Sequence, residues 1–300
     1  MPSSPQTMPA ERLSGILNLA AGALLISFAP VFVRLAGVGP ITAGVYRGLF
    51  GALALFVIAL TIQRRFRPGT GTLLWTGLAG LVFAGDLSVW HQSILSVGPG
   101  LATVLANFQV FAMMLAAVLL FGERVGGRHL VSAVIALAGL ALLVGPGWGE
   151  LGVQWQRGVL FGLATALFYA WYMLVLRRIQ RGQGLGTQVW QIALTSLWTC
   201  LFLLAETPLM GESLRIPDGT SLGYLVAYGV LCQGLGWLFI SRGLPRVGVS
   251  LAGLIILLQP SLAFCWDVLL FGRPASGTDL AGLALALLGI YLGSTAGGRR

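Results

Sequence analysis

The side chains most able to do chemistry in this sequence are ionisable residues that interrupt long apolar runs. Arg47, Asp86 and His91 lie inside such runs, and Trp90 follows Asp86 by four residues, one turn along the same helical face. Ionisable groups inside a membrane are costly and usually face a cavity or a partner. Arg47 and Asp86 would lie at similar depths, roughly 10 and 14 Å from one membrane surface at 1.5 Å per residue. We therefore expect either an Arg47–Asp86 ion pair that locks two helices or a substrate or proton site at Asp86.

His91 is the second ionisable candidate, because it is the only histidine inside an apolar run. Histidine changes its charge near neutral pH, which would suit coupling or gating. A neutral histidine held by packing and hydrogen bonds is the alternative.

Amide and aromatic side chains inside the other runs complete the candidate substrate site. Amides bond across helices in membrane proteins, and they can also bind the amino and carboxylate groups of a substrate. Aromatic side chains far from a helix end can form an apolar pocket or stack on a substrate. Pro260 should kink its helix, because proline lacks an amide hydrogen. The candidates for substrate binding are Trp90, His91, Asn107, Gln109, Trp171, Tyr172, Gln233, Trp237 and Gln259, with Arg47, Asp86 and Pro260 in structural or coupling roles.

Two further acids, Glu206 and Asp267, fall near the ends of their apolar runs. We expect both at the rim of the bundle. Asp267 is also a candidate for an outer gate.

Several reaction classes are excluded by what the sequence lacks. All 18 basic residues are arginine, so neither a Walker A loop nor a Schiff-base lysine can form. The two histidines are far apart and no HExxH or CxxC motif occurs, so we expect no metal, no cofactor and no enzymatic activity. The three cysteines lie in apolar runs, which argues against a disulfide framework. The net charge of +9 is dispersed, which does not favour nucleic-acid binding.

The elements that must position these residues are membrane-spanning helices. Of the 300 residues, 57% are hydrophobic and only 9% are charged, which leaves too little polar surface for a soluble protein. A span needs roughly 20 mostly apolar residues. The sequence predicts an all-α integral membrane protein with ten spans, at approximately 14–36, 40–62, 72–95, 99–121, 128–146, 157–178, 187–206, 221–242, 248–271 and 278–296.

The arginines predict which side of the membrane each loop faces. Thirteen of them flank the apolar runs at the N-terminus, at every second loop and at the C-terminus. Only four, Arg34, Arg157, Arg215 and Arg273, flank the opposite ends. Cytoplasmic loops carry the excess of basic residues, so both termini should be cytoplasmic.

The second half of the chain repeats the first. Residues 97–145 align with 247–295 at a shift of 150 without a gap, and Val118–Gly122 recurs unchanged as Val268–Gly272. Each copy contains five spans, an odd number, so the second copy should enter the membrane inverted. We expect two inverted five-helix repeats, at 1–148 and 149–300, which is the architecture of secondary transporters with a midplane site. A duplication that only built a stable bundle is the alternative.

Two turns of the repeat resemble a known family. Phe121–Arg124 and Phe271–Pro274 are similar to the paired motif of the drug/metabolite transporter (DMT) superfamily, and in particular of its EamA-type members. There the motif usually reads Leu-Gly-Glu in both copies, whereas this chain has Arg273 in the second. Three more segments resemble the YddG-type amino-acid exporters of this superfamily: Phe28–Arg34, Tyr46–Gly48 and Asp86–His91.

The resemblance implies a carrier in a bacterial inner membrane that exports aromatic or other neutral amino acids and related small metabolites by alternating access. Its central cavity would be lined by the first, third, fourth, sixth, eighth and ninth helices. A broad-specificity drug/metabolite exporter is the alternative, and an intramembrane enzyme acting on lipids and a channel are rivals from other classes. We expect a monomer in the lipid bilayer. Pairing with a second copy through the glycine-bearing faces of the fifth and tenth helices is the alternative.

Overall fold

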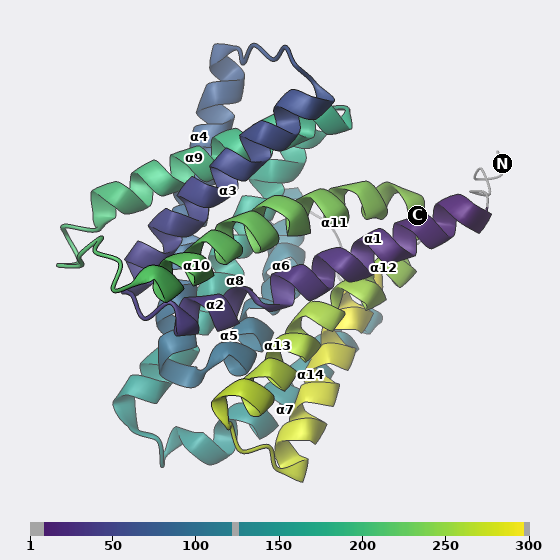
Figure 1. The fold of residues 1–300 in the computed structure, drawn as a ribbon. Helices are drawn as coiled ribbons and strands as arrows, with labels where there is room; N and C mark the ends of the chain where they lie inside the picture. Colours follow the sequence, from purple (N-terminus) through teal and green to yellow (C-terminus); the bar gives the residue numbers. More distant parts are fainter. Residues whose placement is uncertain (1–8, 122–125, 297–300) are drawn as a thin grey trace, which may run out of the picture.

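The fold is a bundle of helices, described by a computed structural model for residues 9–121 and 126–296 (Figure 1). Within those ranges ten segments are helices long and apolar enough to cross a membrane, which confirms the ten predicted spans. The uninterrupted spans are α3 (Pro40–Ile62), α4 (Thr70–Val97), α7 (Gly127–Trp148), α8 (Gly152–Gln180), α9 (Leu185–Glu206) and α14 (Gly277–Ala296).

The other four spans are each built from more than one element. The first consists of α1 (Pro9–Ser27) and α2 (Ala29–Leu35), and the fourth of α5 (Pro99–Ala106) and α6 (Gln109–Phe121). The eighth consists of α10 (Gly219–Ala227), the π-helical η1 (Tyr228–Gly236), α11 (Trp237–Gly243) and the short 3₁₀ turn η2 (Leu244–Arg246). The ninth consists of α12 (Val249–Ile256) and α13 (Leu258–Phe271).

Proline and side-chain competition explain where these spans break. Pro260 has no amide hydrogen for the carbonyl of Ile256, and the ninth span breaks at that turn, where the sequence predicts a kink. Pro30 interrupts the first span in the same way, between α1 and α2. The fourth span breaks without a proline, where the Asn107 side-chain amide donates to the carbonyl of Thr103 at 2.8 Å and competes with the helix.

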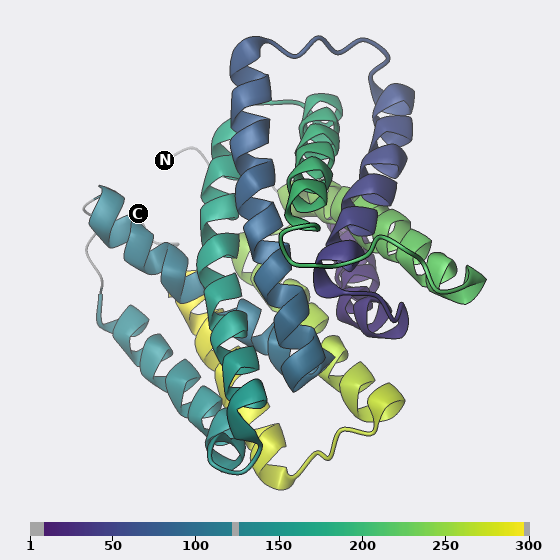
Figure 2. The ribbon, with the colours of Figure 1, turned by 90° about the vertical axis from the view of Figure 1, so that its left-hand side faces the viewer.

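The two sequence repeats are reflected in how the helices pair. α7 packs on α14, α3 packs on α9, and the fourth span meets the ninth through α5 and α13, so each of these spans contacts its own counterpart in the other repeat. α4 packs on α8, side by side in Figure 2, just as their counterparts α11 and α1 pack together. If every span is replaced by its counterpart in the other repeat, the same pairs of neighbouring spans result, as a two-fold relation requires.

α7 and α14 approach each other closely through matched small residues. A β-carbon added to Gly139 would overlap the backbone of Ala286, and one added to Gly289 would overlap the backbone of Ala136. Gly139 and Gly289 are 150 residues apart, as are Ala136 and Ala286, so the contact is self-complementary. Small residues let transmembrane helices pack backbone against backbone. The glycine-bearing faces of the fifth and tenth spans therefore cover each other within one chain.

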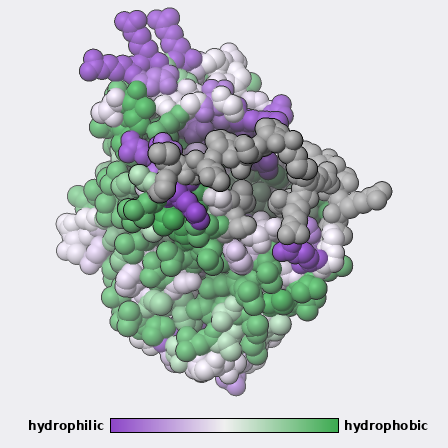
Figure 3. Space-filling model, turned by 90° about the vertical axis from the view of Figure 1, so that its right-hand side faces the viewer, coloured by the Kyte–Doolittle hydropathy of each residue, from purple (hydrophilic) through white to green (hydrophobic). Residues whose placement is uncertain are grey.

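The outside of the bundle is apolar along the spans. Largely exposed leucine and valine side chains point outward from several of them, among them Leu53, Val57, Leu74, Leu119 and Leu269. Figure 3 shows hydrophobic residues over much of the lower part of one face and hydrophilic side chains towards its upper end. An apolar surface of this extent requires lipid rather than water around it. The chain is therefore a multi-pass membrane protein.

Candidate functional site

Eight buried side chains from four elements meet inside the bundle, and we call them the central cluster. Phe83, Asp86 and Trp90 share one face of α4, because they are spaced by three and four residues. The full set is Arg47 on α3, Phe83, Asp86, Trp90 and His91 on α4, Tyr172 on α8, and Tyr228 and Gln233 on η1.

Arg47 is held by neutral partners rather than by a carboxylate. Its Nε donates to Gln233 Oε1 at 2.9 Å, and its Nη1 donates to the Tyr228 hydroxyl at 2.7 Å. The guanidinium carbon lies over three aromatic rings, at 5.2, 5.7 and 4.9 Å from the ring centres of Phe83, Trp90 and Tyr228. These distances permit cation–π attraction, which is strongest away from water. An aromatic cage thus takes the place of a counter-ion.

Asp86 has no cationic partner in the described part of the chain. The expected ion pair with Arg47 is not formed, because Gln233 and Tyr228 hold the guanidinium instead. Among the described residues none donates a hydrogen bond to the buried Asp86 Oδ1. A buried carboxylate without a partner is costly to keep. Of the two roles expected for Asp86, the helix-locking ion pair is not formed in this structure, and the substrate or proton site stays a prediction.

The hydrogen bonds of His91 indicate which of its ring nitrogens carries the hydrogen. Nδ1 lies 2.7 Å from the carbonyl oxygen of Pro40, which can only accept, so Nδ1 is the donor. Nε2 lies 2.8 Å from the Tyr228 hydroxyl, which accepts from Arg47 and has its own hydrogen free to donate to Nε2. A second positive charge beside Arg47 would be unfavourable. The arrangement fits a neutral His91 that connects α4 to α3 and η1.

Two more polar atoms of the central cluster are buried without a partner among the described residues, the indole nitrogen of Trp90 and the hydroxyl of Tyr172. The Tyr172 ring stacks on Phe83 with ring centres 4.4 Å apart, and Trp237 meets it edge-on at 6.4 Å. Buried polar groups are nearly always hydrogen-bonded in proteins. A carboxylate oxygen, an N–H and a hydroxyl, all unpaired beside a caged arginine, are contacts that a polar ligand would complete.

Of the remaining sequence candidates, Trp237 touches the central cluster through Tyr172, and the other four substrate-binding candidates have no hydrogen bond to it among the described residues. Trp171 is 61% exposed on the outside of α8, next to the fully buried Tyr172, so the structure does not bring it to the cluster. Asn107 bonds to its own helix. Gln109 and Gln259 are half-buried, just after the breaks in the fourth and ninth spans.

Sequence reasoning missed Phe83 and Tyr228, which supply two rings of the Arg47 cage. Phe83 could have been found from the sequence, because it precedes Asp86 by three positions and therefore lies on the same helical face. Tyr228 was not, because it precedes Gln233 by five residues, which places them about 140° apart on an α-helix. In the π-helical η1 the hydrogen bonds span five residues, and both side chains reach Arg47.

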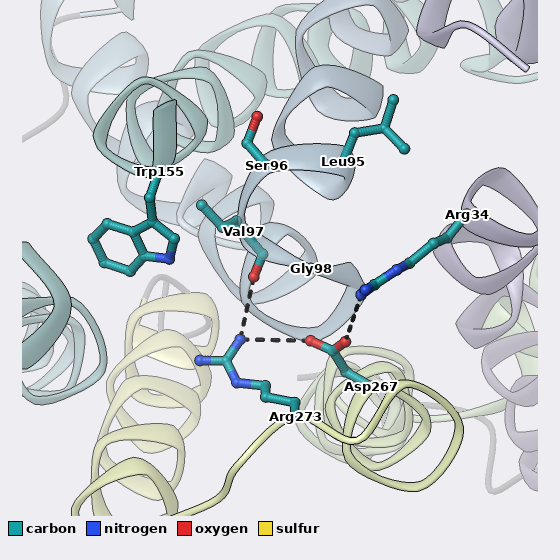
Figure 4. A pocket seen from close by; sticks show the side chains of 8 residues that line it. All are labelled: Arg34, Leu95, Ser96, Val97, Gly98, Trp155, Asp267 and Arg273. Atoms are coloured by element: carbon teal, nitrogen blue, oxygen red, sulfur yellow. Dashed lines mark hydrogen bonds and ion pairs between the residues drawn. The ribbon is translucent and has the colours of Figure 1, made fainter. Parts of the chain in front are cut away.

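A second group of charged residues lies at one end of the bundle. We call Arg34, Asp267 and Arg273 the outer cluster, because the arginine distribution predicts that this end faces away from the cytoplasm. Asp267 is 1% exposed, so it is not a rim residue, and it pairs with Arg34 and with Arg273 at 3.5 Å each (Figure 4). It also accepts from the Gly100 N–H at 3.1 Å, and Arg273 donates to the Val97 carbonyl at 3.4 Å.

The outer cluster ties four spans together through one carboxylate. Arg34 comes from α2, Asp267 from α13, Val97 ends α4, and Gly100 lies in the first turn of α5. Gly98 joins α4 to α5 with φ of 90°, and a β-carbon there would lie 2.6 Å from the Asp267 carboxylate. This turn therefore needs glycine for both conformation and space. The outer-gate role of Asp267 stays a prediction.

The two copies of the repeat motif can be compared only in part. Gly122, Glu123 and Arg124 of the first copy lie outside the described residues. In the second copy Gly272 adopts a left-handed φ of 66°, which ends α13. Arg273, which replaces the usual glutamate of the motif, contacts Asp267 and Val97.

Comparison with known proteins identifies similar chains. The model of the EamA-like transporter family matches residues 13–145 and 156–295. An uncharacterized protein of Pseudomonas aeruginosa is 32% identical over 80% of this chain and 81% of its own. A probable amino-acid metabolite efflux pump of Salmonella typhimurium is 24% identical over 89% of each chain. One solved crystal structure shares the fold, with a TM-score of 0.66 and 22% identity over 96% of this chain and 100% of that one.

Proposed function

The chain belongs to the EamA-like transporter family, and from this premise we propose that it is a secondary transporter that exports aromatic or other neutral amino acids and related small metabolites. The similarity to a probable amino-acid metabolite efflux pump supports this substrate class. The observation that carries the proposal is the unpaired Asp86 carboxylate beside the separately held Arg47 guanidinium.

An amino acid carries the two charges that these groups would complement. Its ammonium group would donate to Asp86 Oδ1, which has no donor among the described residues. Its carboxylate would bind Arg47 through Nη2, for which the described residues offer no acceptor. Charged hydrogen bonds of this kind are about twice as strong as neutral ones. The absence of a direct Arg47–Asp86 pair leaves both charges available to one ligand.

The walls of the central cluster suit an apolar side chain. Phe83 and Trp90 lie against Arg47, Tyr172 stacks on Phe83, and Trp237 meets Tyr172 edge-on. The unpaired indole nitrogen of Trp90 and hydroxyl of Tyr172 add polar contacts. Aromatic side chains recognise flat apolar groups by stacking and edge contacts. This lining favours aromatic and other neutral amino acids over acidic or strongly basic ones.

Transport would proceed by alternating access around the central cluster. Three spans are broken and a fourth is π-helical, which are common features of transporter helices that bend around a midplane site. The ion pairs of Asp267 hold the outer ends of several spans together in the present conformation. The family resemblance implies a bacterial inner membrane, and the arginine distribution predicts that both termini face the cytoplasm.

The test is uptake of radiolabelled amino acids into proteoliposomes that contain the purified protein, with and without a pH gradient. We expect saturable phenylalanine or tryptophan uptake that is lost in Asp86→Asn. Tyr291→Phe is the control, since Tyr291 lies on α14, away from the central cluster. Uptake without a gradient would support facilitated transport, and gradient dependence would support coupling at Asp86. A failure of every amino acid to accumulate or exchange would refute the substrate class.

A cation exporter is the second candidate, because an unpaired carboxylate among aromatic rings also suits an apolar amine. Competition with phenethylamine, which lacks the carboxylate of phenylalanine, separates the two functions. Equal competition by both molecules would favour the cation exporter. Competition by phenylalanine alone would favour the amino-acid exporter.

A further inference from the structure

The outer cluster borders a cavity that the central cluster does not share. Its volume is about 220 Å³, and it is lined by Arg34, Leu95, Ser96, Val97, Gly98, Trp155, Asp267 and Arg273. Figure 4 shows Arg34 and Arg273 reaching Asp267 from opposite sides, with Trp155 across the gap from Arg34. These residues lie at the ends of four different spans or in the turns that follow them.

The charge of this lining favours an anion. Its charged residues are two arginines and one aspartate, which gives a net charge of +1. Each guanidinium has five N–H donors, yet Arg34 reaches Asp267 through Nη1 alone, at 3.5 Å. Arg273 uses Nη1 for both Asp267 and Val97, and its Nη2 lies 4.0 Å from Asp279. Most of the guanidinium donors thus have no close acceptor among the described residues.

The size of the cavity and its apolar wall further restrict which ligands it can bind. Pockets for drug-sized molecules begin at about 300 Å³, so this cavity suits a smaller compound. Leu95, Val97 and the half-buried indole of Trp155 form a wall that a phosphate or sulfate would not use. A flat apolar group could stack on Trp155 while its carboxylate binds the arginines.

We propose that this outer cavity is a second binding site, which takes the carboxylate of a small organic acid with an apolar group through Arg34 and Arg273. The proposal rests on the proposed function in one respect: if the protein exports amino acids, an exported amino acid passes this site as it leaves. Arg273 stands where the family motif usually has glutamate, so the replacement puts a positive charge in the lining of this cavity. Arg34 is the more exposed of the two arginines, with 41% of its side chain accessible, and it would contact the ligand first.

The test is binding of benzoate to the purified full-length protein, followed by tryptophan fluorescence. We expect a saturable change that is absent in Trp155→Phe, and no such change with benzyl alcohol, which lacks the charge. Arg34→Gln and Arg273→Gln should each weaken binding by about tenfold, the effect of one charge-assisted hydrogen bond. Arg215→Gln, an exposed arginine outside this cavity, is the matched control and should bind benzoate as the unaltered protein does.

Several results would overturn the proposal. Non-saturable binding would do so, as would equal affinities in the unaltered protein, Arg34→Gln and Arg273→Gln. Loss of benzoate binding in Asp86→Asn would place the ligand in the central cluster instead. Arg34→Gln leaves the Arg273–Asp267 pair intact, so the test survives if Arg273→Gln fails to fold. Benzoate binding without amino-acid transport would refute only the proposed function, and transport without benzoate binding would refute only this site.

Discussion

Replacement of Tyr228 by phenylalanine is the sharpest test of the arrangement around Arg47. The substitution removes one oxygen and leaves the aromatic ring in place. That hydroxyl accepts from Arg47 at 2.7 Å and lies 2.8 Å from His91 Nε2, and all three side chains are buried. Tyr228→Phe therefore breaks two hydrogen bonds at once and leaves a guanidinium N–H and an imidazole nitrogen without their partner.

The expected loss follows from the two bonds. A hydrogen bond to a charged group contributes about 1.5–3 kcal/mol, and a neutral one between membrane helices contributes on average about 0.6 and at most about 1.7 kcal/mol. We therefore expect Tyr228→Phe to lower the free energy of unfolding by about 2–4 kcal/mol. The cation–π contact with the ring should survive, because the ring is unchanged.

The assay is reversible unfolding of the purified protein in mixed micelles, with helix content as the signal. Tyr291→Phe is the matched control, since its hydroxyl has no hydrogen bond to the described residues, and it should fall within about 0.5 kcal/mol of the unaltered protein. A loss below about 0.5 kcal/mol in Tyr228→Phe would refute the reasoning. Arg47 and His91 would then be satisfied without the hydroxyl.

Three further predictions concern the charges and the helix contacts. Asp86→Asn should abolish amino-acid uptake while keeping or raising the free energy of unfolding, because it removes an unpaired buried charge; parallel loss of stability would contradict this. Gly139→Leu should reduce the yield of folded protein, or lower the free energy of unfolding by about 1–3 kcal/mol, because the side chain would meet the α14 backbone. Gly145→Leu, with open space around its α-carbon within the described structure, is the control for the same unfolding measurement. Asp267→Asn should open the outer end, so that a cysteine at Ser96 reacts about tenfold faster with an impermeant thiol reagent from outside; an unchanged rate would exclude a gate role.

The spans and the break at Pro260 could be predicted from the sequence because both depend on local composition. Apolar runs, arginine-rich loops and prolines act on the segment that contains them. The rotation of each helix could not be predicted in the same way. Trp171 and Tyr172 are adjacent in an almost wholly apolar helix, and no polar stripe indicates that Tyr172 faces inward and Trp171 outward.

In the candidate site, too, the local features could be predicted from the sequence and the contacts between spans could not. The sequence identified Asp86, Trp90, His91 and Gln233 from their type and depth, and the structure places them in one cluster. The partners of Arg47 could not be found, because η1 departs from α-helical geometry and brings Tyr228 to the guanidinium. The burial of Asp267 likewise depends on partners from other spans, which no local pattern encodes.

The matched contact between α7 and α14 can form only late in synthesis, because the two helices are far apart in the chain. Residues 149–276 separate the two helices, so at 5–20 residues per second α14 leaves the ribosome roughly 6 to 30 s after α7. During that interval the small-residue face around Gly139 has been synthesised without the partner that covers it in the finished chain. α14 is thus the helix that completes this contact, and a chain stopped before Gly277 lacks the partner of the small-residue face of α7.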